Sequence, residues 1–314
     1  MTGYRHGLHE LGDGLCAYLQ PEGGWGLSNA GLISAPGASL LVDTLYDLRR
    51  TAAMLESMAP RLAASPLRAA FNTHGDPDHC FGNQLLPADA TVIATRGAAD
   101  AMARRSAAAV RQMLGGASLD PAFAAFARER FGSFDFEGIE QRLPSETFEG
   151  RREAWVGERL VELIELGPAH SEGDAIAHVP DAAVVFTGDL VFAGGTPIVW
   201  AGPISRWLAA CDAILTLGAR TIVPGHGPLS NADAVRSVQR YLRHVHDEAA
   251  RRFEAGMAPE EAADDIELGD FAALGDPERI VVNVETVYRE LDPSRPPQPV
   301  PELFARMARW AARH

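Results

Sequence analysis

The sequence has few cysteines and no long apolar segment. Among its 314 residues, the thiols are those of Cys16, Cys80 and Cys211. Scattered cysteines of this number do not form a disulfide framework, which indicates a reducing compartment, with the cytoplasm as the default. No stretch approaches the roughly 18 apolar residues of a membrane span, and residues 1–14 lack the apolar segment of a secretion signal. We therefore expect a cytoplasmic protein with no membrane association.

Basic residues are outnumbered by acidic ones, 28 against 42, and the net charge is −14. Such a charge repels a polyanion unless the basic residues cluster on one face, so we do not expect nucleic acid as a substrate. Two common catalytic patterns are also absent. No glycine-rich phosphate loop follows a strand, and there is no Gly-x-Ser-x-Gly nucleophile elbow. These absences set aside P-loop enzymes and serine hydrolases of the α/β type.

Short apolar runs and amphipathic stretches alternate along most of the chain. Runs bounded by Gly, Pro or Asp predict strands, and apolar residues at helical spacing predict helices. The predicted strands are 14–20, 30–35, 38–44, 67–74, 90–95, 159–166, 174–180, 182–189 and 220–226. The predicted helices are 47–62, 97–114, 121–131, 203–218, 232–256, 277–291 and 302–314. This mixture predicts an α/β protein.

Two parts of the chain repeat the same order of elements. The run "LLVDT", a helix and a strand ending at His74 are echoed by "VVFTGD", a helix and a strand ending at His226. We therefore predict two β-rich halves facing each other with helices outside, a four-layer αββα sandwich. It would occupy residues 1–256, with a lid-like insertion at 115–157. A helical extension at 257–314 would pack on it without taking part in chemistry, or else form a homodimer contact.

Seven histidines and aspartates follow four of the predicted strands. A metal-activated water needs nitrogen and oxygen ligands on rigid elements, with a coordination position left open. Each residue alone has an ordinary interpretation, as a turn residue, a cap or a backbone position. Together, at matching strand ends, they predict a metal site. The candidate ligands are His74, Asp76, Asp78, His79, His170, Asp189 and His226.

The other histidines and the cysteine beside His79 receive simpler interpretations. We assign none of the remaining histidines that we considered to the metal site, namely His6, His9, His178, His244 and His246. Cys80 has no evident base beside it, so we interpret it as a small buried residue rather than a nucleophile.

Four motifs resemble those of the metallo-β-lactamase superfamily: "NTHGDPDH", "GPAHSEGD", "FTGDLVF" and "VPGHGP", in that order. The metal motif of that superfamily is H-x-H-x-D-H, followed by a His, a bridging Asp and a final His. The resemblance implies that His74 and His170 hold a first divalent ion, with Asp189 bridging to a second. The residues implied for the second ion are Asp78, His79 and His226. Zinc is the first expectation for both ions, with Mn²⁺ or Fe²⁺ as alternatives.

Asp76 departs from the motif, because it stands where the second histidine is expected. A carboxylate there adds negative charge, which should make the centre neutral and weaken its Lewis acidity. It also favours harder ions such as Mn²⁺ or Fe²⁺. Asp78 and Asp76 are the candidate catalytic residues that orient the attacking water or pass protons.

Longer stretches resemble one branch of the superfamily, the cyclases and thioesterase-cyclases of aromatic polyketide (antibiotic) biosynthesis. They are "PEGGWGLSNAGLI", "HCFGNQLL", "GDLVFAGGTPIVWAGPISRWLAACDAIL" and "RIVVNVETVYREL". The branch implies aldol cyclisation and dehydration of a polyketide, free or bound to an acyl carrier, and hydrolysis of its thioester. A flat substrate requires apolar walls, for which Trp25, Phe81 and Trp200 are the candidates. Phe192 is a further candidate that core packing explains equally well.

Three other interpretations stay open. The first is a simple thioester or lactone hydrolase with the same metal centre. The second is a mononuclear iron enzyme that oxidises a thiol through His74, His170 and Asp189. The third is a binding protein with a degraded metal site, for which Asp76 would be the first lesion.

Overall fold

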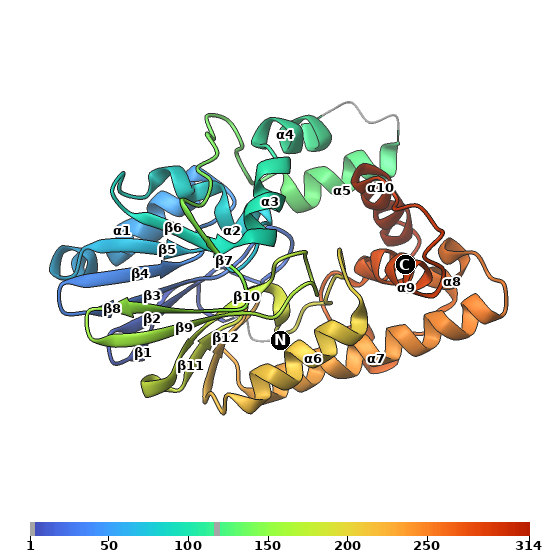
Figure 1. The fold of residues 1–314 in the computed structure, drawn as a ribbon. Coiled ribbons are helices and arrows are strands. Elements are labelled where there is room, and N and C mark those ends of the chain that lie inside the picture. Colours follow the sequence, from blue (N-terminus) through green and yellow to red (C-terminus); the bar gives the residue numbers. More distant parts are fainter. Residues whose placement is uncertain (1–3, 116–119) are drawn as a thin grey trace.

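Two β-sheets packed face to face form the centre of the computed structural model, which describes residues 4–115 and 120–314 (Figure 1). In the first sheet the order is β1 (Gly7–Gly12), β2 (Leu15–Leu19), β3 (Ala30–Ala35), β4 (Ala38–Val42), β5 (Leu67–Phe71), β6 (Thr91–Thr95) and β7 (Glu146–Phe148). In the second the order is β12 (Thr221–Val223), β11 (Val184–Phe186), β10 (Ala175–Val179), β9 (Arg159–Glu165) and β8 (Arg151–Val156). Strands pair in parallel from β4 to β7 and between β11 and β12, and antiparallel elsewhere.

Alternation of side chains along the strands produces the central core layer. In β2, Leu15, Ala17 and Leu19 face the second sheet, whereas Cys16 and Tyr18 face the opposite way. This is the period of two that a strand buried on both faces requires. The sheets approach closely where Phe186 meets Gly31, because a Cβ on Gly31 would lie 2.1 Å from the Phe186 ring.

Helices cover the outer face of each sheet. Helix α1 (Leu48–Ala64) places Met54 and Met58 against the outer face of the first sheet. Helices α6 (Ile204–Thr216) and α7 (Ala232–Glu254) cover the second sheet, where Trp207 joins the same cluster as Val185. The predicted αββα sandwich of the α/β class is therefore confirmed.

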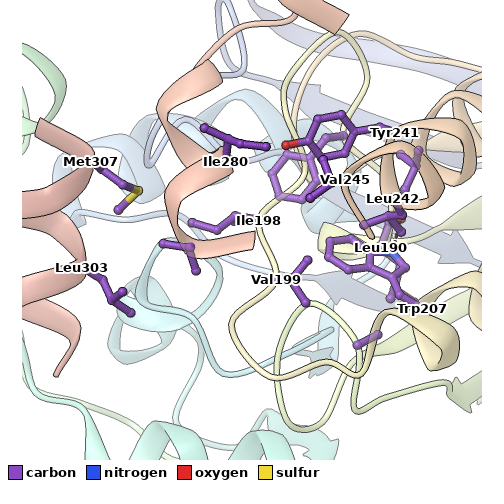
Figure 2. Close-up of a cluster of buried hydrophobic side chains, with 14 of the residues drawn as sticks. Leu190, Ile198, Val199, Trp207, Tyr241, Leu242, Val245, Ile280, Leu303 and Met307 are labelled. Carbon is purple, nitrogen blue, oxygen red and sulfur yellow. Dashed lines mark hydrogen bonds between the residues drawn. The ribbon is translucent and has the colours of Figure 1, made fainter. Parts of the chain in front are cut away.

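The C-terminal helices extend this outer layer. They are α8 (Pro259–Asp265), α9 (Ile280–Leu291) and α10 (Val300–Ala311). Figure 2 shows Ile280, Leu303 and Met307 from the tail in one cluster with Trp207 and Tyr241 of α6 and α7. The tail thus shares a core with the sandwich. The described residues contain no helix long and apolar enough to span a bilayer.

Three strands were not predicted: β1, β7 and β8. All three are edge strands, and their exposed positions interrupt the apolar alternation that predicts a strand. In β8, for example, Arg151, Glu153 and Trp155 are exposed at alternate positions. Because β7 and β8 lie within the predicted insertion at 115–157, residues 146–156 belong to the sheets rather than to a lid. Residues 116–119 of that insertion lie outside the described residues.

The single helix predicted at 97–114 is wrong. The chain instead forms α3 (Arg96–Arg104) and α4 (Ala107–Gly115), with Arg105 between them in an extended conformation (φ −107°, ψ 140°). Helix α5 (Pro121–Phe131) matches its prediction, and its N-terminus is capped by Asp120. Helix α10 packs against α5, through an ion pair of 2.7 Å between Arg309 and Asp120.

Candidate metal centre

The seven predicted ligand residues meet where strands of both sheets end. They fall into three overlapping groups, in each of which one nitrogen or oxygen atom per residue lies within 4.8 Å of the others. The groups are His74 with Asp76 and His170, His74 with His79 and Asp189, and Asp78 with His79 and His226. Residues from four distant parts of the sequence therefore form one site, as the motif spacing predicts.

Asp189 lies at the centre of this site. Its Oδ1 is 3.1 Å from Nε2 of His79, and its Oδ2 is 3.4 Å from Nε2 of His226 and 3.5 Å from Nε2 of His170. Nε2 of His74 is 4.0 Å from the same Oδ2. One carboxylate thus faces four imidazoles, the arrangement that a bridging ligand needs. Gly225 permits it, because a Cβ there would lie 1.9 Å from Oδ1 of Asp189.

The other two aspartates face one histidine each at close range. Oδ2 of Asp76 lies 3.3 Å from Nε2 of His170, and Oδ2 of Asp78 lies 3.3 Å from Nε2 of His226. The second oxygen of Asp76 forms an ion pair with Arg105. Burial would raise the pKa of Asp76, but Arg105 and His170 bring that pKa well below its ordinary value. Asp76 is therefore an ionised ligand candidate.

Asp43 lies outside the three ligand groups but orients two of their histidines, and it was not among the residues predicted for the site. Its carboxylate accepts hydrogen bonds from Nδ1 of His79 (2.9 Å) and from the Thr73 backbone N–H and hydroxyl (2.7 Å each). The Thr73 hydroxyl in turn lies 3.0 Å from Nδ1 of His74. The available signal was its position at the end of β4, where a polar residue follows a buried strand as the ligands do. Such outer carboxylates fix the orientation of metal-binding imidazoles.

Buried polar atoms without partners test whether the residues fit a metal. Nε2 of His74, Nε2 of His79 and Oδ1 of Asp189 are buried with no hydrogen bond. The Nδ1 atoms of His74, His79 and His170 are engaged outward, the last on the Ile198 carbonyl at 2.8 Å. Each Nε2 therefore points its lone pair into the site. Burying such atoms unpaired is costly, and imidazole with carboxylate is the donor set that zinc and related divalent ions bind. The residues fit a metal centre.

The charges of the site point the same way. Burial alone would lower the pKa of His170, but Asp76 and Asp189 raise it to about 9. Burial would likewise lower the pKa of His226, but Asp189 and Asp78 raise it to about 9. The three aspartates thus favour cations in this site, either protons on imidazole or metal ions that release those protons on binding.

A cavity of about 690 Å³ opens above these residues. Asp76, Asp78, Asp189, His170 and His226 line its bottom; with His74 and His79, which are buried in the same groups, they make up what we call the floor. Six aromatic side chains line the walls of the cavity, those of Trp25, Tyr46, Phe131, Phe192, Trp200 and Phe304, together with aliphatic residues and four arginines, Arg104, Arg105, Arg279 and Arg289. Apolar walls above a few converging polar groups are typical of a small-molecule site.

The structure separates the predicted substrate contacts. Trp25 and Trp200 line the cavity, as does Phe192. Phe81 does not: it is 1% exposed, and its ring packs on Tyr46 with centroids 6.0 Å apart. The prediction for Phe81 is wrong, because the short helix after the ligand loop turns this side chain into the protein core.

The tail contributes to the walls, contrary to its interpretation as packing alone. Phe304 lies 5.3 Å from Trp25 and 6.0 Å from Phe131, measured between ring centroids. Nε1 of Trp25 donates a hydrogen bond of 2.7 Å to Glu278, and the Arg279 guanidinium lies 4.3 Å above the Trp25 ring. None of the four metal-motif stretches contains these tail residues, since they meet the cavity only through tertiary packing.

The residues set aside by the sequence interpretation stay outside the site. None of the metal-capable groups in residues 4–115 and 120–314 includes His6, His9, His178, His244 or His246. His178 instead pairs with Glu162 at 2.8 Å. Cys80 is 2% exposed, and burial raises the pKa of its thiol, which agrees with its interpretation as a small buried residue.

Comparisons with known proteins agree with this geometry. The sequence profile of the metallo-beta-lactamase superfamily matches residues 23–226. A linear primary-alkylsulfatase from a Pseudomonas species is 22% identical over 263 residues, covering 76% of this chain and 49% of that protein. The range matched by the superfamily profile, residues 23–226, contains all seven candidate ligands.

Solved structures share the fold at low sequence identity. A metallo-beta-lactamase from Pontibacter korlensis is 15% identical with a TM-score of 0.58, over 76% of this chain and 99% of that one. A variant of the sec-alkyl sulfatase PisA1 is 17% identical with a TM-score of 0.63, over 94% of this chain and 52% of that one. This chain spans about half the length of the alkylsulfatases it matches. None of these named proteins is a polyketide cyclase.

Proposed function

Because this chain belongs to the metallo-β-lactamase superfamily, we propose that it is a metal-dependent hydrolase acting on the ester or thioester bond of a bulky aromatic acyl substrate. One observation carries the proposal: four histidines and three aspartates converge on the floor of a cavity with aromatic walls. The floor supplies donors for metal ions, and the walls match an apolar acyl group.

Asp189 faces His170, which belongs to one group of ligand candidates, and His79 and His226, which belong to another. His74, His170 and Asp76 would hold one divalent ion, and Asp78, His79 and His226 a second. Zinc is the first expectation from the imidazole-rich donors, with Mn²⁺ or Fe²⁺ as alternatives. When bound, such ions polarise a carbonyl and make water a nucleophile at neutral pH.

The protein's own groups orient the reactants. Asp78 faces the cavity, and its side chain is 15% exposed. Burial would raise the pKa of Asp78, but His79 and His226 lower it, so the carboxylate stays ionised and can accept a hydrogen bond from the attacking water. Asp76 has one oxygen occupied by Arg105, which makes Asp78 the better placed of the two catalytic candidates. The aromatic walls bind the acyl group and exclude bulk water.

A second candidate reaction is aldol ring closure of an aromatic polyketide, followed by loss of water. The observation that favours it is the number of aromatic side chains around a cavity of about 690 Å³, because flat polycyclic intermediates stack on such walls. The same residues would hold the metal ions, which would supply the electrophilic character that ring closure needs. In this version the substrate arrives on an acyl carrier, and the same floor hydrolyses the thioester of the product.

The experiment combines elemental analysis of the purified protein with a substrate panel. The panel holds aromatic and short aliphatic acyl thioesters, a lactone, a primary alkyl sulfate and a linear poly-β-ketone thioester. We expect about two zinc or manganese ions per chain, with the highest kcat/KM on the aromatic thioester. If the alkyl sulfate is turned over faster than the thioesters, the proposed acyl substrate is wrong and a sulfate ester takes its place, as in the named sulfatases.

Two further results would overturn the proposal. One iron per chain with uptake of oxygen and oxidation of a thiol would assign the site to an oxygenase. No bound metal, even after reconstitution with zinc and manganese, would leave a binding protein with a degraded site.

A further inference from the structure

Asp76 and Arg105 form an ion pair at the edge of the candidate metal centre. Nη1 of Arg105 contacts Oδ1 of Asp76 and also donates a hydrogen bond of 3.2 Å to the Gly75 carbonyl. The other oxygen of Asp76, Oδ2, lies 3.3 Å from Nε2 of His170 and belongs to the group formed with His74. The carboxylate thus has one oxygen on the guanidinium and the other toward the metal pocket.

The local backbone explains why Arg105 reaches this position. Helix α3 ends at Arg104, and the extended conformation of Arg105 interrupts the helical stretch before α4. The ligand loop packs directly on α3, since a Cβ on Gly75 would lie 2.7 Å from the Ala98 carbonyl oxygen and 2.8 Å from Cβ of Ala101. The helix break and the close packing therefore hold the two charged groups together. Side-chain exposure is 13% for Asp76 and 35% for Arg105.

The ion pair of Asp76 and Arg105 has a net charge of zero, as does the neutral histidine that the superfamily motif has at position 76. A metal-binding imidazole is neutral, whereas a carboxylate carries a negative charge and a guanidinium a permanent positive one. Asp76 alone would make the centre more negative, as the sequence interpretation supposed. With Arg105 bound to it, the oxygen ligand is provided without a change in total charge.

We propose that Asp76 and Arg105 act as one charge-neutral unit in place of a metal-binding histidine. Asp76 ligates through Oδ2, and Arg105 is a positioning residue that holds Oδ1 and offsets its charge. This inference rests on the metal centre of the proposed function but not on its substrate. It also corrects the expectation that Asp76 reduces the positive charge of the centre.

The test compares the zinc affinity of two single variants and of their combination, measured on metal-depleted protein by competition with a chromophoric chelator. Asp76→His leaves Arg105 uncompensated beside an imidazole, so we expect weaker zinc binding by about tenfold. Arg105→Met leaves an uncompensated carboxylate, so we expect tighter binding by about tenfold. The double variant, with a neutral histidine and no guanidinium, should return to within about threefold of the wild type.

Matched variants distinguish charge compensation by Arg105 from other roles that this residue could have. Arg105→Lys keeps the charge and should stay within about threefold of the wild type in zinc affinity. Arg96→Met removes an exposed arginine of the same helix, which pairs with Glu149, and should leave the zinc affinity unchanged. Arg105→Gln replaces the methionine variant if that protein does not fold, with the same expected direction. Circular dichroism and thermal unfolding establish that each variant is folded.

Other outcomes would contradict the proposal that Asp76 and Arg105 act as one charge-neutral unit. Weaker zinc binding by Arg105→Met, or a double variant that binds zinc as weakly as Asp76→His alone, would show that Arg105 does not compensate the charge of Asp76. Unchanged zinc affinity with a higher KM would make Arg105 a substrate-binding residue instead. Absence of zinc binding by the wild type would contradict the proposed function itself, which is a separate result.

Discussion

The floor and the walls of the cavity are built in different ways. The floor consists of buried ionisable side chains that follow strands, all within residues 23–226. The walls include aromatic rings drawn from several segments, among them the loop around Trp25, α5 and the C-terminal tail. Under the proposed function, this difference implies a division of tasks: the floor determines the reaction, and the walls determine which substrate binds.

Removal of a floor ligand should have the largest effect. In His226→Ala the imidazole facing Asp78 and Asp189 is lost, so we expect one fewer metal ion per chain and a fall in kcat on the order of a thousandfold. Elemental analysis and thioester turnover measure the two changes. His178→Ala, outside the groups, is the matched control. Unchanged metal content in His226→Ala would refute the ligand assignment.

A core substitution tests whether the walls belong to the same folding unit as the floor. Ile280 is fully buried in the cluster that joins the tail to α6 and α7 (Figure 2). We expect Ile280→Ala to lower the free energy of unfolding by about 2–5 kcal/mol, in one cooperative transition followed by urea denaturation. The exposed residue Leu291 provides the control substitution, Leu291→Ala. Two separate transitions would instead support the predicted division after residue 256.

Outer support of the floor should have an intermediate effect. Asp43→Asn weakens the hold on His79 and on Thr73, so we expect zinc affinity to fall by about 10–100-fold while the fold is kept. Competition with a chelator measures the affinity. Asp181→Asn, which removes a surface pair with Arg159, should leave it unchanged. Equal zinc affinity in the wild type and Asp43→Asn would remove Asp43 from the centre.

A wall substitution should have the smallest effect and should alter substrate preference alone. Phe304→Ala removes a ring that contacts Trp25 and Phe131, so we expect KM for a bulky aromatic thioester to rise about tenfold. Metal content and turnover of a short aliphatic thioester should not change. Trp155→Ala, on the exposed edge strand β8, is the control. Loss of metal in Phe304→Ala would break the distinction between floor and walls.

The floor could be predicted from the sequence because its signals are local. His74, Asp76, Asp78 and His79 follow one buried strand directly, and Asp189 follows another. A polar residue at the end of an apolar run is visible without knowledge of the fold. The same reasoning located the layers of the sandwich, since alternating and helical periods record which face of each element is buried.

The walls and the outer contacts could not be predicted because they depend on tertiary packing. Phe304 contacts Trp25 in space although most of the sequence separates them, and no sequence pattern near either residue predicts the contact. Phe81 adjoins the ligands in sequence, yet its side chain points into the core. Arg105 fell within a continuous helical pattern, so neither the helix break nor its pairing with Asp76 was visible.

The contact between α5 and α10 has a consequence for how related proteins diversify. The ion pair of Arg309 with Asp120 and the rings of Phe131 and Phe304 join two segments that lie far apart in the chain. A relative that accepts a differently shaped substrate would have to exchange residues in both segments together, because altering one ring alone leaves apolar surface without its packing partner. We therefore expect correlated variation between these helices, independent of the metal-binding motifs, to record substrate divergence.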